Sequence, residues 1–281
     1  MLIGPGNLPG RTTVAHCSDC RTSWLSDYSR PHDYWEGGQE TAYTGREAAV
    51  ALRREAEADL RLLELFAKPG RLVDIGCGLG DFIEAANDRG WRAQGIDPST
   101  RAVEAARSRG LRTSLGSAEQ PGLPPESFDA VTMRDVLEHA CDPLLALKSC
   151  AELLKCRGLL FVRTPNELSL YKGIARALWK ASLGRLSTPL SFVYYTPHHF
   201  AFSARSFEQA LPRLGFKMVR LIKRNTPTEF SRAQFAQHHP HSPWASTVSK
   251  LIPIVQVAAS IVGRENKLVV LAKKEKANHE R

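Results

Sequence analysis

The stretch LVDIGCGLGDF, residues 72–82, decides the fold. A short apolar run is followed by three glycines at every second position, Gly76, Gly78 and Gly80, and Asp74 stands two residues before the first of them. Glycine permits a tight turn and lets a ligand approach the backbone closely. In open parallel sheets such glycines occupy the first turn between strand and helix, at the carboxyl edge where ligands bind. The stretch therefore predicts a strand, a ligand-binding turn and a helix.

The spacing of the glycines indicates which ligand the turn would bind. A dinucleotide fold has G-x-G-x-x-G, whereas here the order is G-x-G-x-G and Asp81 takes the place of the last small residue. A P-loop is excluded because no Gly-Lys-Ser/Thr follows. The carboxylate of Asp74 would repel a pyrophosphate and favour a ligand with positive charge. Asp97, 21 residues after Gly76, ends the next apolar run, where it can accept hydrogen bonds from ribose hydroxyls. These features predict S-adenosylmethionine as the cofactor.

Beyond the glycine turn, short apolar runs alternate with helical stretches. The spacing predicts strands over 71–76, 91–97, 111–117, 127–135, 157–164, 216–224 and 266–274, and helices over 44–66, 80–90, 99–110, 142–155 and 203–215. Such alternation is typical of an α/β fold with a doubly wound parallel sheet. Two inserts, at about 166–200 and 226–263, interrupt it; the first is basic and partly helical, and the second is expected to be irregular.

Five stretches carry a resemblance to a known family: VDIGCGLG (73–80), GIDPS (95–99), GSAEQPGLPPESFDAV (116–131), RDVLEHACDP (134–143) and VRTPN (162–166). Between about residue 71 and residue 215, and in its last strand, the chain resembles the class I SAM-dependent methyltransferases. It is most similar to the group that includes the ubiquinone-biosynthesis O-methyltransferases and many small-molecule and sugar methyltransferases. The resemblance implies a Rossmann-like seven-stranded sheet of order 3-2-1-4-5-7-6, whose seventh strand is antiparallel.

The resemblance also assigns further residues to the cofactor site. By analogy with the family, the adenine would be lined by Ser117, Ala118 and Glu119. The methionine end of the cofactor would be lined by Arg134 and Asp135, and Arg46 would lie near the carboxylate.

The nature of the acceptor is narrowed by what the sequence lacks. No Asn/Asp-Pro-Pro-aromatic motif follows the fourth strand, no Pro-Cys dipeptide occurs, and no RNA-binding module is recognisable. We therefore expect a small-molecule acceptor rather than nucleic acid, with oxygen favoured over nitrogen or carbon. A non-catalytic SAM-binding or regulatory protein of the same fold remains the alternative.

Three histidines are candidates for the general base: His139, His198 and His199. Each could instead cap an element or pack in the core. Metal-dependent O-methyltransferases bind a divalent ion with several acidic side chains. No such set of metal-binding acids is found in this sequence, so no catalytic metal is expected.

The positive charge of the chain is concentrated in its second half. The chain has 38 Lys and Arg against 29 Asp and Glu, and residues 201–281 hold 14 of these basic and five of these acidic side chains. In the first insert, Lys172, Arg176 and Lys180 recur every four residues, which predicts a basic face on an amphipathic helix. This helix is expected to act as a lid or to contact a membrane surface. An acidic, lipid-linked or glycosyl acceptor would suit either role.

The amino-terminal segment, 1–43, is expected to be separate from a methyltransferase domain at 44–281. Cys17 and Cys20 form half of a zinc site, which His16 or His32 could complete, although a lost or absent site is equally open. The six cysteines are scattered, no apolar run is long enough to span a bilayer, and no secretory signal is recognisable. We therefore expect a cytoplasmic protein, with peripheral membrane contact as an option.

Overall fold

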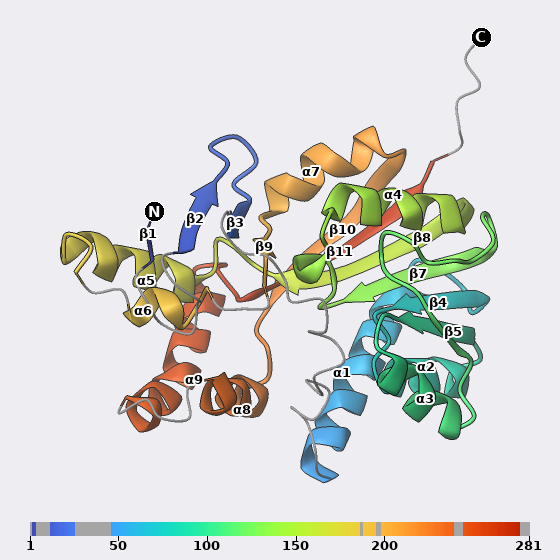
Figure 1. The fold of residues 1–281 in the computed structure, drawn as a ribbon, viewed down its shortest axis with the longest axis horizontal. Helices are drawn as coiled ribbons and strands as arrows, with labels where there is room; N and C mark the ends of the chain where they lie inside the picture. The colour runs from blue at the N-terminus through green and yellow to red at the C-terminus, as the bar shows by residue number, and fades with distance from the viewer. Residues whose placement is uncertain are drawn as a thin grey trace. The chain divides into compact units, whose positions relative to one another are not determined.

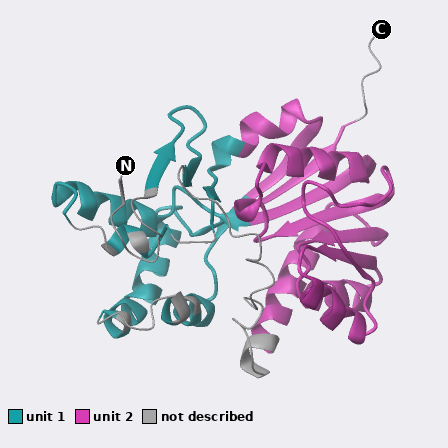
Figure 2. Cartoon of the chain, in the orientation of Figure 1, with its two compact units in different colours: residues 1–30, 164–206, 222–269 teal, residues 31–163, 207–221, 270–281 magenta. Residues whose placement is uncertain are grey.

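A computed structural model describes residues 2–3, 12–25, 46–185, 188–194, 198–238 and 244–275. The chain divides into two compact units, which Figure 2 colours separately. Unit 1 comprises residues 1–30, 164–206 and 222–269, and unit 2 comprises residues 31–163, 207–221 and 270–281. The described residues of both predicted inserts belong to unit 1. The division expected after residue 43 stays a prediction.

A seven-stranded sheet, mainly in unit 2, forms the centre of the fold. Its strands are β4 (Arg71–Ile75), β5 (Arg92–Asp97), β6 (Thr113–Leu115), β7 (Phe128–Arg134), β8 (Leu154–Pro165), β10 (Phe216–Arg224) and β11 (Lys267–Lys274). They lie in the order β10-β11-β8-β7-β4-β5-β6, which confirms the predicted order. The strands from β8 to β6 pair in parallel. The antiparallel direction of the last strand stays a prediction.

The helices that alternate with these strands along the chain cover both faces of the sheet. Three of them, α1 (Arg46–Glu64), α2 (Asp81–Asp88) and α3 (Thr100–Ser108), lie on one side, and α4 (Pro143–Leu153) and α7 (Ala204–Arg213) lie on the other (Figure 1). The sequence accounts for their ends. The hydroxyl of Ser99 accepts a hydrogen bond from the N–H of Ala102 at the start of α3, and Gly90 follows α2 with a φ of 86°.

Unit 1 combines a small antiparallel sheet with four helices. The sheet contains β1 (Leu2–Ile3), β2 (Thr12–His16), β3 (Ser23–Leu25) and β9 (Phe200–Ala201), in that order. The helices are α5 (Leu170–Ala181), α6 (Thr188–Ser191), α8 (Thr228–His238) and α9 (Ala245–Ile261). Val14, Leu25, Ala175, Leu190 and Tyr194 form a buried cluster that joins sheet and helices into one core.

The prediction that the second insert is irregular is wrong, because α8 and α9 occupy most of it. Pro253 obscures the helical pattern, since proline removes a hydrogen bond from a helix interior. The helix nevertheless buries Ile252, Gln256 and Ala259 at helical spacing. The amide Nε2 of Gln256 also donates to the carbonyl of Thr226 at 2.7 Å. Tertiary packing therefore offsets the cost of the proline.

None of the helices in the described ranges is long and apolar enough to cross a membrane.

Candidate functional site

The glycine turn between β4 and α2 has a backbone that only glycine adopts easily. Gly76, Gly78 and Gly80 have φ angles of 69°, 52° and 88°. The N–H groups of Gly76 and Cys77 both donate to the carbonyl of Ile96, at 2.8 and 3.1 Å, so the turn is fixed to the end of β5. The predicted strand, turn and helix are confirmed.

The three glycines differ in what surrounds them. A Cβ atom on Gly76 would lie 2.4 Å from Cγ2 of Val136, and one on Gly80 would lie 2.4 Å from Cδ1 of Leu111. A Cβ atom on Gly78 would meet nothing within 4 Å. Gly76 and Gly80 therefore serve the packing of the turn, and Gly78 faces open space where a ligand can approach.

Asp97, at the end of β5, holds the turn through its side chain. The side chain is 8% exposed, and its Oδ2 accepts the N–H of Gly78 at 2.9 Å. Its Oδ1 accepts the N–H of Ser99, also at 2.9 Å. These two bonds fix the carboxylate beside the glycine turn, the place where the sequence predicts that it meets the hydroxyls of a ribose.

Asp74, on β4, is almost completely buried. Its Oδ1 accepts a hydrogen bond from the hydroxyl of Thr132 at 2.6 Å. Burial raises the pKa of Asp74 to about 6, although the positive charge of Arg134 and the Thr132 hydrogen bond oppose the shift. The carboxyl group therefore changes its charge in a mildly acidic range.

Arg134 and Asp135, which the resemblance assigned to the methionine end, form ion pairs with buried partners. The Nε of Arg134 lies 2.9 Å from Oδ2 of Asp59, and the guanidinium lies 4.4 Å from the ring centroid of Phe82. Asp135 has a φ of 60° and pairs with Arg163 through Nε at 2.9 Å. Asp59 also pairs with Arg163, at 3.0 Å, and is fully buried.

Together with Asp74, whose carboxylate interacts electrostatically with Arg134 and Arg163, these pairs form a cluster with excess negative charge, which we call the acid cluster. Its carboxylates belong to Glu55, Asp59, Asp74 and Asp135, and its guanidinium groups belong to Arg134 and Arg163. When all are ionised, the described side chains carry a formal excess of two negative charges. Such a site favours a ligand with positive charge.

Glu55, Asp59 and Arg163 were not predicted from the sequence. The only local signal is the spacing of the two acids by four residues on α1, which places them on one face of that helix.

The residues expected along the adenine mainly organise their own loop. The hydroxyl of Ser117 accepts the N–H of Gln120 at 3.1 Å, and Ala118 is 7% exposed. The carboxylate of Glu119 accepts the N–H of Cys141 at 2.7 Å, which fixes the loop to the start of α4. Adenine contact by these three residues stays a prediction. Arg46 is the first residue of α1, and its side chain lies outside the described residues.

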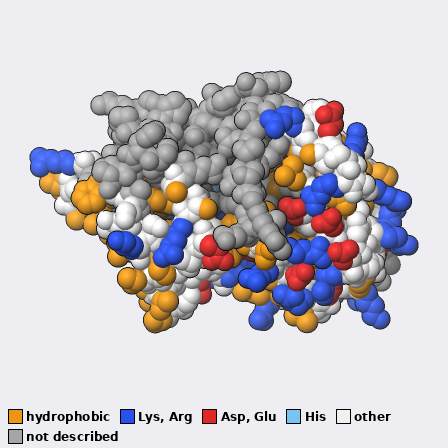
Figure 3. Space-filling model, turned by 90° about the horizontal axis from the view of Figure 1, so that it is seen from below, with side chains coloured by type: hydrophobic (Ala, Val, Ile, Leu, Met, Phe, Trp, Pro, Cys, Tyr) orange, Lys and Arg blue, Asp and Glu red, His pale blue; other side chains and the backbone are white. Residues whose placement is uncertain are grey.

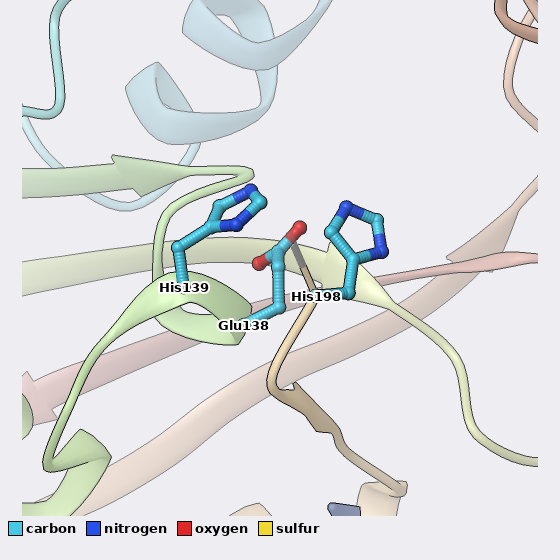
Figure 4. A group of neighbouring side chains, drawn as sticks. All are labelled: Glu138, His139 and His198. Carbon is cyan, nitrogen blue, oxygen red and sulfur yellow. The ribbon is translucent and has the colours of Figure 1, made fainter. Parts of the chain in front are cut away.

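Of the three candidate bases, His139 belongs to unit 2. It ends the short 3₁₀ helix η2 (Leu137–His139), directly after the fully buried Glu138, and the two side chains have metal-ligating atoms within 4.8 Å of each other (Figure 4). His198, the third side chain labelled there, belongs to unit 1. His199, also in unit 1, has its Nε2 3.0 Å from the backbone carbonyl of Leu25, which fixes the ring to β3.

The predicted basic face of α5 is wrong for Lys172, and Arg176 contributes to it only in part. Lys172 is only 7% exposed, and its Nζ lies 2.9 Å from Oε2 of Glu167. Arg176 pairs with the other oxygen of the same carboxylate, and only Lys180 is exposed. The buried charge of Glu167 draws Lys172 inward and pairs with Arg176, whose side chain is 21% exposed, so Lys172 does not share a surface with Lys180. Membrane contact stays a prediction.

Cys17 and Cys20 lie on the turn between β2 and β3. The N–H of Cys20 donates to Sγ of Cys17 at 3.4 Å, and this bond lowers the pKa of the Cys17 thiol. His16 instead places Nδ1 3.0 Å from the hydroxyl of Ser23, and His32 lies outside the described residues. Within the described ranges, neither cysteine belongs to a group of three metal-ligating side chains. Zinc binding stays a hypothesis.

Comparisons with known proteins agree with this geometry. The family model described as a methyltransferase domain matches residues 49–221, more than half of the chain. A ubiquinone biosynthesis O-methyltransferase from Xanthomonas campestris is 41% identical over 113 residues, which are 36% of this chain and 46% of that protein. Its counterpart from Colwellia psychrerythraea is 34% identical over 104 residues, covering 34% and 42%. The chain thus matches less than half the length of these curated relatives.

Solved structures share the fold. Phosphoethanolamine N-methyltransferase 2 from Haemonchus contortus, in complex with S-adenosyl-L-methionine, aligns with a TM-score of 0.57 at 16% identity, over 90% of this chain and 62% of that one. A SAM-dependent methyltransferase from Thermotoga maritima aligns with a TM-score of 0.53 at 22% identity, over 82% and 94%. At these identities the likeness shows the Rossmann-like fold that the sequence predicted.

Proposed function

Because the chain belongs to the methyltransferase-domain family, we propose that it transfers a methyl group from S-adenosylmethionine to an oxygen atom of a small-molecule acceptor. The described residues fit this cofactor. The cofactor has an ammonium group, a sulfonium group and a ribose, and the acid cluster and Asp97 offer partners for all three. The observation that carries the proposal is the carboxylate of Asp97, which holds Gly78, the glycine of the turn that faces open space.

The sulfonium of the cofactor supplies an activated methyl group. The protein's own residues then have two tasks, which are to hold the two reactants in line and to remove a proton from the acceptor. The glycine turn and Asp97 serve the first task. They are fixed by backbone hydrogen bonds to β5, so that little ordering is needed when the ligand binds.

For the second task, His139 is the first candidate. It lies on η2, four residues after Asp135 of the acid cluster and in the same unit as the glycine turn. His198 is the second candidate, since it lines a cavity of unit 1. His199 is the weakest candidate because its Nε2 already contacts the carbonyl of Leu25.

Support for oxygen comes from the curated relatives, since these are named ubiquinone biosynthesis O-methyltransferases. Support for a cytoplasmic location comes from the six free cysteines, which suit a reducing compartment.

The test is transfer of a labelled methyl group from S-adenosylmethionine to a panel of acidic, lipid-linked and glycosyl acceptors that carry a hydroxyl group. Once an acceptor is found, His139→Gln should lower the rate by about 10²–10⁴-fold while cofactor affinity stays unchanged. His199→Gln, the matched control, should retain the rate. If the cofactor binds and no acceptor is methylated, the alternative of a non-catalytic SAM-binding protein is favoured.

A further inference from the structure

Unit 1 contains a cavity of about 270 Å³. The end of β8, the first turns of α5, and parts of α8, α9 and β11 surround it. Its volume corresponds to roughly nine water molecules at about 30 Å³ each, and it is close to the lower end of small-molecule sites, about 300 Å³. The space is therefore large enough for a small organic ligand.

Most of the side chains that surround this cavity are apolar. They include Ala175 of α5, Phe192, Phe235 of α8, and Val248 and Ile252 of α9. Phe192 and Phe235 meet edge to face, with ring centroids 5.0 Å apart. Aromatic and aliphatic walls of this kind bind the apolar part of a ligand and leave water poorly hydrogen-bonded.

The charged side chains at the cavity are all of one sign. Lys172 and Lys267 line it, whereas no aspartate or glutamate is found among its described lining residues. Lys172 lies in the first turn of α5, together with Ser169, which caps that helix and also lines the cavity. The amino terminus of a helix carries partial positive charge, which adds to the charge of the lysine.

The carboxylate that pairs with Lys172 belongs to Glu167, which is fully buried and is not among the described lining residues of the cavity. Glu167 pairs with Arg176 as well. Burial alone would raise the pKa of Glu167, but Lys172, Tyr194 and Arg176 together hold that pKa below its usual range. Its hydroxyl donors are Tyr194, at 2.7 Å, and Ser23, at 2.9 Å. One carboxylate with two cationic partners leaves a formal excess of one positive charge.

From these observations we infer that the cavity of unit 1 binds an amphipathic anion. Its apolar body lies between Phe192, Phe235 and Ile252, and its carboxylate or phosphate group lies toward Lys172 and Lys267. The identification of this ligand as the methyl acceptor rests on the proposed function. The inference that the cavity binds the ligand is independent of it.

Apolar exposed residues near the cavity suit such a ligand. Ile174 lines the cavity and is 42% exposed, and α9 exposes Leu251, Ile254 and Val257 at 47%, 64% and 63%. Hydrophobic side chains reach the surface on the left of Figure 3, the side that unit 1 occupies in Figure 2. An apolar body longer than the cavity could therefore continue over protein surface that is itself apolar.

The experiment is a calorimetric titration of the full chain, without S-adenosylmethionine, using four probes that share a ten-carbon chain. Decanoate and decyl phosphate carry the anion, decanol is neutral, and decyltrimethylammonium is a cation. We expect at least one anion to bind ten times or more tightly than decanol, and the cation to bind more weakly still. Preference for decanoate or for decyl phosphate identifies which anionic group the lysines accept. Equal binding of all probes would overturn the inference.

Variants then locate the binding. Val248→Trp fills the cavity and should abolish binding of the anion, whereas Ile261→Trp, at an exposed position at the end of the same helix, should leave it unchanged. Lys267→Met should weaken binding about tenfold without disturbing the Glu167 pairs. Unchanged binding in Val248→Trp would contradict the cavity as the site.

A parallel titration with S-adenosylmethionine separates this inference from the proposed function. If the cofactor binds and neither anion does, the cavity inference fails and the proposed function stands. If an anion binds and the cofactor does not, the proposed function fails and the cavity inference stands.

Discussion

The two units each bury a cluster of ion pairs, and the clusters are opposite in sign. In unit 2, the acid cluster sets four carboxylates against two guanidinium groups. In unit 1, the single carboxylate of Glu167 faces the two cations Lys172 and Arg176. Unbalanced buried charge costs free energy unless a ligand or solvent neutralises it. The difference indicates that the two units are built for ligands of opposite charge, a cation in unit 2 and an anion in unit 1.

The largest effect is expected for Glu167→Ala in unit 1. It leaves Lys172 and Arg176 without the carboxylate that pairs with both, so the free energy of unfolding should fall by about 3–5 kcal/mol. Urea unfolding at neutral pH measures this loss. Glu167→Gln keeps an acceptor for the hydroxyl of Tyr194 and should lose less. A loss below about 1 kcal/mol in Glu167→Ala would mean that water already screens these cations.

Asp74→Asn tests the acid cluster through pH. The pKa of Asp74 is about 6 in the folded protein and 3.8 ordinarily. Between these values the folded state binds a proton that the unfolded state has lost, so this group makes the protein less stable as pH rises from about 4 to about 6. The variant should lack that slope and exceed the wild type in stability by about 3 kcal/mol at pH 7. Identical pH profiles of the two proteins would contradict this.

Asp74→Asn should raise stability at pH 7 but lower the affinity for the cofactor at that pH. Ionised Asp74 favours a cation, so the affinity of the wild type for S-adenosylmethionine should rise as pH increases through 6. In Asp74→Asn this increase should be reduced, and titrations at pH 5 and pH 7 would reveal it. Decanoate binding in unit 1 is the control, since its dependence on pH should not change in the variant.

Alanine substitutions in the glycine turn should have smaller effects on stability, and these effects should differ between Gly76 and Gly78. Gly76→Ala places a Cβ 2.4 Å from Val136 at a φ of 69°, and should lose more than the about 1–2 kcal/mol that a left-handed residue costs. Gly78→Ala meets open space, so it should lose only about that amount and should mainly weaken cofactor binding. Thermal unfolding and titration of both variants check this. If both lost stability equally and bound the cofactor equally, the assignment of Gly78 to the ligand would be wrong.

The sequence allowed the glycine turn, Asp97 and the order of the sheet to be predicted, because each depends on local spacing or on the family pattern. The partners in the acid cluster could not be found in this way. Asp59 pairs with Arg134 across 75 residues and with Arg163 across 104, and only the folded sheet brings them together.

In unit 1, periodicity was misleading for a related reason. Lys172 and Arg176 follow Glu167 by five and nine residues, and a helical pattern alone does not show that the acid is buried behind them. The helical pattern of α9 was likewise obscured by Pro253.

One small residue was also missed. In dinucleotide folds, a third glycine of the loop lets the helix approach the strand closely. In this protein the close approach depends on Gly95 of β5. A Cβ atom at that position would lie 2.4 Å from Cδ1 of Ile83 and 2.5 Å from Sγ of Cys77. Counting glycines in the turn could not reveal this, because the tight contact comes from the neighbouring strand.

The most direct test of the whole account is calorimetric titration of S-adenosylmethionine into the wild type and into Asp97→Ala. Asp142→Ala is the matched control, since Asp142 also accepts two backbone N–H groups but at the start of α4. The account predicts micromolar binding that falls more than tenfold, or about 1.4 kcal/mol, in Asp97→Ala and persists in Asp142→Ala. No heat from the wild type, or equal affinity in Asp97→Ala, would contradict the assignment of this site to the cofactor.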